Sequence, residues 1–239
     1  MLLTSSDFTG LVASYAYATI LLVLAEALRR WIGLPSELTR KLIHIGAGMW
    51  VFGVVALFDR WEVGIVPFAT FIPINYLLYR YRILGAMDTA DSSPGTVYFA
   101  VSVTLLFGLL WRPDGPVDRV PIAIAGVMAM TWGDALAALI GKRIGKHRYR
   151  IGSSERSWEG SAAMFVASAV AMFGVLWLLP GSSLSPLAAP FGVQPALLIA
   201  LVSAVFATLV EAVSPHGTDN LSVPLVGAGV AIAIALCFS

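Results

Sequence analysis

The chain has 239 residues, of which 58% are hydrophobic and only 12% are charged, and its net charge is +1. Soluble domains carry roughly 25% charged residues, so these proportions exclude an ordinary soluble fold, and the balanced charge gives no indication of a nucleic-acid partner. A single cysteine, Cys237, excludes an internal disulfide and a thiolate metal cluster. The mean hydropathy of +0.84 indicates a membrane protein instead.

Long apolar segments follow one another along the whole chain. A membrane crossing takes about 20 helical residues, so the length permits about eight crossings and leaves no room for a soluble domain. We therefore expect one integral membrane domain over residues 1–239, an all-α polytopic bundle of about eight transmembrane helices. The segments lack the alternation of a barrel strand. The expected spans are Phe8–Leu28, Ile43–Phe58, Val63–Tyr79, Val97–Trp111, Val120–Ile140, Ser161–Leu179, Pro195–Val213 and Leu221–Phe238.

The first of these segments is expected to be a retained span. Residues 1–7 contain no Lys or Arg, so the basic region of a cleavable signal peptide is missing.

Arginine and lysine gather in every second loop. The loops that share this excess are 29–42, 80–96, 141–160 and 214–220. They hold twelve of these cations, whereas the alternate loops hold only Arg60, Arg112 and Arg119. By the positive-inside rule we expect the first set on the cytoplasmic side of the cell membrane and both termini on the other side.

Ionisable side chains inside or at the end of a span are costly, so each needs a partner or a function. Glu26, His44, Asp134 and Glu211 are such residues, and all four lie near the cytoplasmic end of their spans in this topology. One site at that interface explains them together. An ion pair with the arginines three and four residues later is an alternative for Glu26.

Cations precede the second span. Arg40, His44 and Gly48 share one helical face, with Lys41 beside them. Arginine, lysine and imidazole suit an anionic group such as a phosphate. Anchoring at the inner membrane surface is the alternative for Arg40 and Lys41.

The fifth span carries a stripe of small residues that begins with a carboxylate. The stripe consists of Asp134, Ala138, Gly141 and Gly145. The small side chains in this stripe permit close approach of a ligand or of a second helix. The carboxylate with Lys142 and Lys146 suits Mg²⁺ and a polyphosphate, although the spacing is not that of a Walker loop.

Polar residues also precede the sixth span, where Arg156 is followed by Ser157, Glu159, Gly160 and Ser161. Arg156 is a candidate phosphate ligand. The serine and the glutamate are equally typical of a helix start, which remains open as their alternative role.

The third cluster joins the last two spans. Glu211, Asp219 and Asn220 offer hard oxygen ligands suited to Mg²⁺. Capping of the last helix is the alternative for Asp219 and Asn220. Asp88 and Asp91 lie in a further cytoplasmic loop, where turn formation explains them equally well.

Together these motifs resemble the polyprenol kinase family, which includes phytol, farnesol and dolichol kinases and CTP-dependent diacylglycerol kinase. The matching motifs are Arg-Lys-x-x-His at 40–44, Gly-Asp-Ala at 133–135, Gly-x-x-x-Gly-Lys at 141–146, Ser-x-Glu-Gly-Ser at 157–161 and Asp-Asn-Leu-x-x-Pro at 219–224. The stretch at 153–160 is also similar to the signature of the phosphatidate cytidylyltransferases, but it lacks that signature's proline and has Glu155 in place of one lysine.

The resemblance implies an enzyme that phosphorylates a membrane-embedded lipid alcohol with a nucleoside triphosphate, typically CTP, and with Mg²⁺ or Mn²⁺. The implied catalytic and metal-binding residues are Asp134, Glu211 and Asp219. The implied nucleotide- and phosphate-binding residues are Arg40, Lys41, His44, Lys142, Gly145, Lys146, Arg156, Ser157, Glu159, Gly160, Ser161 and Asn220. A cytidylyltransferase-like synthesis of a CDP-lipid and a transporter are the alternatives, and the sequence does not define the oligomeric state.

Overall fold

The computed structural model describes residues 3–83, 93–152, 154–215 and 217–238. Its helices and strands are α1 (Ser5–Ile32), α2 (Ser36–Leu57), α3 (Trp61–Gly64), α4 (Val66–Tyr81), α5 (Gly95–Leu110), α6 (Val120–Ile144), β1 (Arg148–Ile151), β2 (Ser154–Ser157), α7 (Trp158–Leu178), α8 (Val193–Val213) and α9 (Asp219–Ala235). Each of the eight expected spans corresponds to a helix, with α3 and α4 together forming the third. The predicted all-α membrane fold is therefore confirmed.

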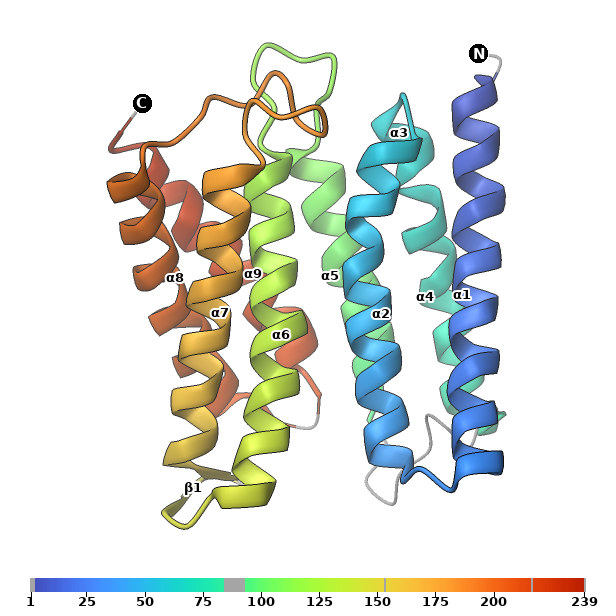
Figure 1. The fold of residues 1–239 in the computed structure, drawn as a ribbon, viewed down its shortest axis with the longest axis vertical. Coiled ribbons are helices and arrows are strands. Elements are labelled where there is room, and N and C mark those ends of the chain that lie inside the picture. Colours follow the sequence, from blue (N-terminus) through green and yellow to red (C-terminus); the bar gives the residue numbers. More distant parts are fainter. Residues whose placement is uncertain (1–2, 84–92, 153, 216, 239) are drawn as a thin grey trace.

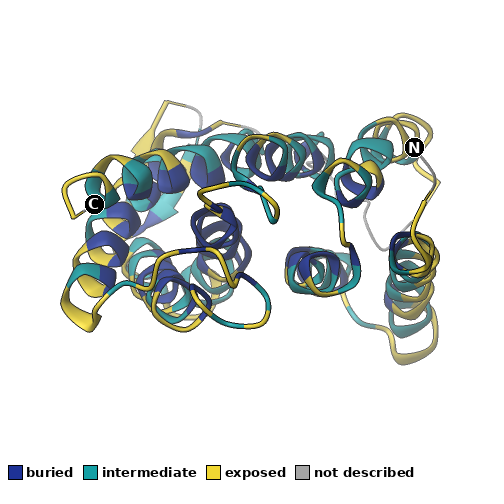
Figure 2. Ribbon diagram, turned by 90° about the horizontal axis from the view of Figure 1, so that it is seen from above, coloured by how far each residue is buried: buried dark blue, intermediate teal, exposed yellow. Residues whose placement is uncertain are grey.

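The helices run along one common direction, and both termini lie at the same end of the bundle (Figure 1). Within the described residues six helical segments are long and apolar enough to cross a membrane, and the apolar helices α5 and α9 are shorter. Figure 2 shows exposed residues mainly on the outer sides of the helices. Outward apolar residues are expected of a bundle surrounded by lipid.

Helix α6 is the centre of the bundle. Every residue from 120 to 131 is buried, because α6 packs against α7 and α9 on one side and against α2 and α5 on the other. A helix that is apolar all round lies either in a protein core or in contact with lipid, and over this segment α6 lies in the core. Helix α6 therefore joins the part formed by α1–α5 to the part formed by α7–α9.

Several helices extend beyond the apolar segments predicted for them. Helix α2 begins at Ser36, so Arg40 and Lys41 lie within its first two turns rather than in a loop. Hydropathy marks the hydrocarbon thickness, whereas a helix continues for as long as its backbone bonds and side chains allow. The cations are consequently held on a rigid element.

A short antiparallel hairpin, β1–β2, connects α6 to α7 and was not predicted. Arg148 pairs with Ser157 and Ile151 with Ser154, so the hairpin ends directly at the first turn of α7. Ser157 is the N-cap of α7, and its hydroxyl oxygen accepts a hydrogen bond from the Gly160 amide at 3.1 Å. The predicted capping role of Ser157 is confirmed.

Glycines permit close helix contact at the junction of the two parts. A Cβ atom on Gly48 of α2 would lie 2.1 Å from the Thr131 hydroxyl of α6. We expect Gly48→Ala to lower the free energy of unfolding by about 1–3 kcal/mol, the usual cost of overpacking. Thermal unfolding in detergent measures this, with Gly108→Ala as the control because nothing lies within 4 Å of a Cβ there. An unchanged midpoint for Gly48→Ala would show that α2 and α6 are not packed this closely.

Candidate active site

A cavity of about 710 Å³ lies between the two parts of the bundle. Its wall is made by α1, α2, α4 and α5 on one side and by α6, β1, β2, α7, α8 and α9 on the other. This volume is within the roughly 300–1,000 Å³ usual for small-molecule sites.

The two ends of the cavity differ in chemistry. Charged and amide side chains surround one end, here called the charged end: Glu37, Arg40, Lys41, His44, Asp134, Lys142, Arg148, Glu155, Arg156, Glu211, Asp219 and Asn220. Small and aromatic side chains form the other end, here called the apolar limb: Ala18, Ala47, Trp50, Phe68, Phe71, Ala100 and Val103. A ligand that fills this cavity must therefore combine an anionic or polar portion with an apolar one.

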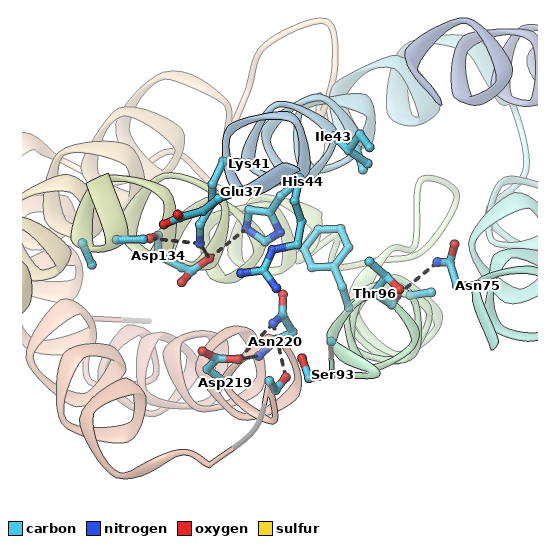
Figure 3. Close-up of a pocket in the computed structure, with 18 of the residues that line it drawn as sticks. Glu37, Lys41, Ile43, His44, Asn75, Ser93, Thr96, Asp134, Asp219 and Asn220 are labelled. Atoms are coloured by element: carbon cyan, nitrogen blue, oxygen red, sulfur yellow. Dashed lines mark hydrogen bonds and ion pairs between the residues drawn. The ribbon is translucent and has the colours of Figure 1, made fainter. Parts of the chain in front are cut away.

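A buried ion pair joins α2 to α6 at the charged end (Figure 3). The Lys41 Nζ donates a hydrogen bond to Asp134 Oδ2 at 2.5 Å, and the side chains are only 10% and 17% exposed. His44 Nε2 lies 3.8 Å from the same oxygen, and its ring contacts Phe99 with centroids 5.2 Å apart. Asp134 is thus ion-paired with Lys41 and lies beside the His44 ring, close to where charged and aromatic walls meet.

A second set of charges comes from the hairpin and the last two helices. Arg156 Nε of β2 lies 2.8 Å from Glu211 Oε1 of α8, and its Nη2 lies 4.0 Å from Asp219 Oδ2 of α9. The two neighbouring residues of β2 have different partners: Glu155 pairs with Arg148 within the hairpin, whereas Arg156 extends toward α8 and α9. Residues distant in sequence are therefore brought to one point by β2.

The first turn of α9 positions Asp219 and Asn220 without using them as caps. Thr218 is the N-cap, and Asp219 Oδ1 accepts hydrogen bonds at 2.9 Å from both the backbone and the side-chain nitrogen of Asn220. The Ser102 hydroxyl of α5 donates to the Asn220 carbonyl at 2.9 Å, which ties α9 to α5. The capping alternative for these two residues is therefore not observed.

Most of the predicted site residues line the cavity. They are Arg40, Lys41, His44, Asp134, Lys142, Arg156, Ser157, Gly160, Ser161, Glu211, Asp219 and Asn220.

The structure places Gly145, Lys146 and Glu159 outside the cavity lining. Glu159 Oε1 pairs instead with His147 Nδ1 at 2.7 Å, on the outer side of the hairpin. These three residues remain predictions as nucleotide ligands.

The stripe of small residues on α6 serves two purposes. Asp134, Ala138 and Gly141 all line the cavity. Gly141 also permits the close approach of α7, because a Cβ atom there would lie 3.5 Å from the Gly160 Cα and 3.1 Å from the Ser157 hydroxyl. The lower part of the stripe therefore packs a helix, as one of the two alternatives predicted. Glu26 likewise has the expected intrahelical partners, Arg29 and Arg30.

Three rim residues were not predicted. Glu37 of α2 forms an ion pair with Lys142 of α6, and Arg148 pairs with Glu155 within the hairpin. In the sequence Glu37 has the appearance of a first-turn helix residue. The two strands have only four residues each, and β2 contains no apolar residue that would mark it as a strand. Asp88 and Asp91, considered above for the neighbouring loop, lie outside the described residues.

The described residues contain no group of three or more His, Cys, Asp or Glu side chains placed to hold a metal ion. Asp134 and Glu211 each form a close ion pair with a basic side chain. Asp219 is less closely paired, since the Arg156 guanidinium lies 4.0 Å from its carboxylate. Mg²⁺ typically keeps several waters and takes only one or two carboxylates together with substrate phosphates. The carboxylates at the charged end fit such a shared site, not a cage made by the protein alone.

The fold and the cavity define a polytopic membrane protein whose site combines a phosphate-suited charged end with an apolar limb. No family model and no solved structure matches the chain. The phytol kinase of Synechocystis sp. is 35% identical over 217 residues, which are 90% of this chain and 86% of that protein. The probable chloroplastic phytol kinase of Triticum aestivum is 28% identical over 94% of this chain and 76% of its own length, and phytol kinase 1 of Arabidopsis thaliana is 23% identical over 92% and 73%.

The chain belongs to the phytol kinase family. The family predicted from the motifs is therefore confirmed, and so is the predicted enzyme class, a kinase that acts on a lipid alcohol. A kinase of this class uses a nucleotide as its phosphoryl donor.

Proposed function

We propose that this chain transfers the γ-phosphoryl group of CTP, or of another nucleoside triphosphate, to the hydroxyl group of a lipid alcohol such as phytol. The observation that carries the proposal is the two-ended cavity. The charged end suits a triphosphate, the apolar limb suits a prenyl chain, and both open into one space. Family membership supports the same assignment.

In this proposal the alcohol hydroxyl lies at the boundary of the two ends, beside Asp134. In phosphoryl transfer the protein mainly positions the reactants and neutralises charge. Asp134, ion-paired with Lys41, would accept the hydroxyl proton as the oxygen attacks the γ-phosphorus. The bond from the γ-phosphorus to the bridging oxygen then breaks, and the nucleoside diphosphate leaves.

The cations at the charged end hold the phosphates in line with that hydroxyl. Arg40, Lys142 and Arg156 line the cavity from three different elements, so they can surround a triphosphate. Asp219 and Glu211 would hold the Mg²⁺ or Mn²⁺ that accompanies the nucleotide, and that ion supplies positive charge to the phosphate oxygens. Asn220 fixes Asp219 for this task through the two hydrogen bonds described above.

Transfer of label from CTP tests the proposal against the cytidylyltransferase alternative. Purified protein in detergent is incubated with phytol and with CTP labelled in either the γ- or the α-phosphate. A kinase labels the lipid from the γ-phosphate only and releases CDP. Lipid labelled from the α-phosphate, with release of pyrophosphate, would establish the alternative, and no labelled lipid from CTP or ATP would contradict the proposal.

We further propose that the protein lies in the cell membrane with the charged end of the cavity facing the cytoplasm. The excess of loop cations at that end supports this orientation. Cys237 lies exposed just after α9, at the opposite end, and we expect a membrane-impermeant maleimide to label it in intact cells. In a Cys237→Ser background, Trp31→Cys at the charged end should be labelled only after permeabilisation, and the reverse pattern would invert the topology.

A further inference from the structure

Residues of α2 line the cavity at successive heights, and their chemistry changes along the helix. Lys41, His44, Ala47 and Trp50 all line the cavity and are spaced three residues apart. From Lys41 to Trp50 the helix rises by about 14 Å, at 1.5 Å per residue. An ammonium group, an imidazole, a methyl group and an indole therefore succeed one another from the charged end into the membrane.

Trp50 is held in place at the inner end of this series. Its Nε1 donates a hydrogen bond to the Ser14 hydroxyl at 3.1 Å, and its ring stacks on Tyr17 with centroids 4.3 Å apart and planes inclined by 15°. The Tyr17 hydroxyl in turn donates to the Gly46 carbonyl at 2.9 Å. The indole is thus fixed by α1 as well as by its own helix.

Trp50 is the last residue of α2 that lines the cavity. Val51 and Val54, which follow it, are fully buried, and Phe68 of the cavity wall contacts the fully buried Phe107 with ring centroids 5.3 Å apart. A close-packed interior leaves no room for a further segment of ligand. The lining that α2 provides therefore ends at Trp50, next to the packed core.

We infer that Trp50 limits the chain length of the alcohol and so determines which lipid alcohols are substrates. The inference rests on the proposed kinase function. A prenyl chain with its hydroxyl beside Asp134 extends past Ala47 and meets the indole. A polyprenol of many isoprene units exceeds the space in front of Trp50, so the substrate class is a single short prenol.

Chain-length profiles of cavity variants test the inference. The quantity compared is the ratio of kcat/KM for a long polyprenol, solanesol, to that for phytol, measured in one preparation so that the amount of folded enzyme cancels. We expect Trp50→Ala to raise this ratio by about tenfold or more, in line with the discrimination that pocket size provides. Ala47→Phe fills the limb and should shift activity in the opposite direction, from phytol toward the shorter geraniol.

Trp177→Ala is the matched control. Trp177 also stacks on an aromatic ring, that of Phe173 with centroids 5.5 Å apart and planes inclined by 14°, but it is 45% exposed and lies outside the cavity lining. For Trp177→Ala, the ratio of kcat/KM for solanesol to kcat/KM for phytol should equal that of the wild type.

The outcomes separate the two proposals. A wild-type protein that phosphorylates no alcohol contradicts the kinase function itself. An active wild type whose ratio is unchanged by Trp50→Ala overturns the chain-length inference alone. If Trp50→Ala has no activity on any alcohol, Trp50→Leu decides: a raised ratio supports the role of the indole, and an unchanged ratio overturns it.

Discussion

Asp134→Asn is expected to lower kcat/KM for phytol phosphorylation by about 10²- to 10⁴-fold, the contribution typical of a positioned general base. The substitution keeps the size of the side chain and removes its negative charge. Both the proton acceptor for the hydroxyl and the partner of Lys41 are then lost, because the Lys41 ammonium lies 2.5 Å from Asp134 Oδ2. Initial rates of lipid labelling from γ-labelled CTP measure the effect.

Asp114→Asn is the control for this substitution. Asp114 is exposed and lies between α5 and α6, at the end of the bundle opposite the charged end, so its variant should retain the wild-type rate. Thermal unfolding of both variants shows whether a lost rate reflects lost structure. A folded Asp134→Asn protein with near wild-type turnover would remove Asp134 from the reaction.

The membrane fold could be predicted from the sequence, because every span is a continuous apolar segment of about the hydrocarbon thickness. Helix boundaries could not, since polar residues such as Glu37 continue α2 beyond the apolar segment. The hairpin could not be predicted either: each strand has only four residues, and their pairing depends on where α6 and α7 bring its ends. Local pattern thus defined the helices, and tertiary contacts defined the connection.

The charged end of the cavity was predictable for a related reason. A charge at the end of an apolar span is costly, so Asp134 and Glu211 stood out, and topology placed them at one end of the bundle. Trp50 and Ala47 did not stand out, because an apolar residue that lines a cavity has the same sequence appearance as one that faces lipid. Only the tertiary arrangement, with α1 and α6 packed on α2 and with α4 across the cavity, distinguishes the two.

Arg156→Ala is expected to have the second large effect, which is on both nucleotide binding and stability. Loss of a charge-assisted contact to phosphate should raise KM for CTP by about 10- to 100-fold. The substitution also leaves Glu211, only 4% exposed, without the guanidinium at 2.8 Å, and a buried polar group that loses its partner costs about 1–3 kcal/mol of unfolding free energy. Steady-state kinetics and thermal unfolding in detergent measure the two effects separately.

Two further variants assign these effects to their causes. Arg156→Ala combined with Glu211→Gln removes the unpaired charge, so it should recover much of the stability while KM for CTP stays high. Arg156→Lys keeps the positive charge but loses the planar fork that binds phosphate bidentately, so it should restore stability and only part of the affinity. Arg143→Ala, at an exposed position near the end of α6 outside the cavity lining, should change neither quantity. If Arg156→Ala lowered stability and left KM for CTP unchanged, the arginine would be a structural partner of Glu211 and not a phosphate ligand.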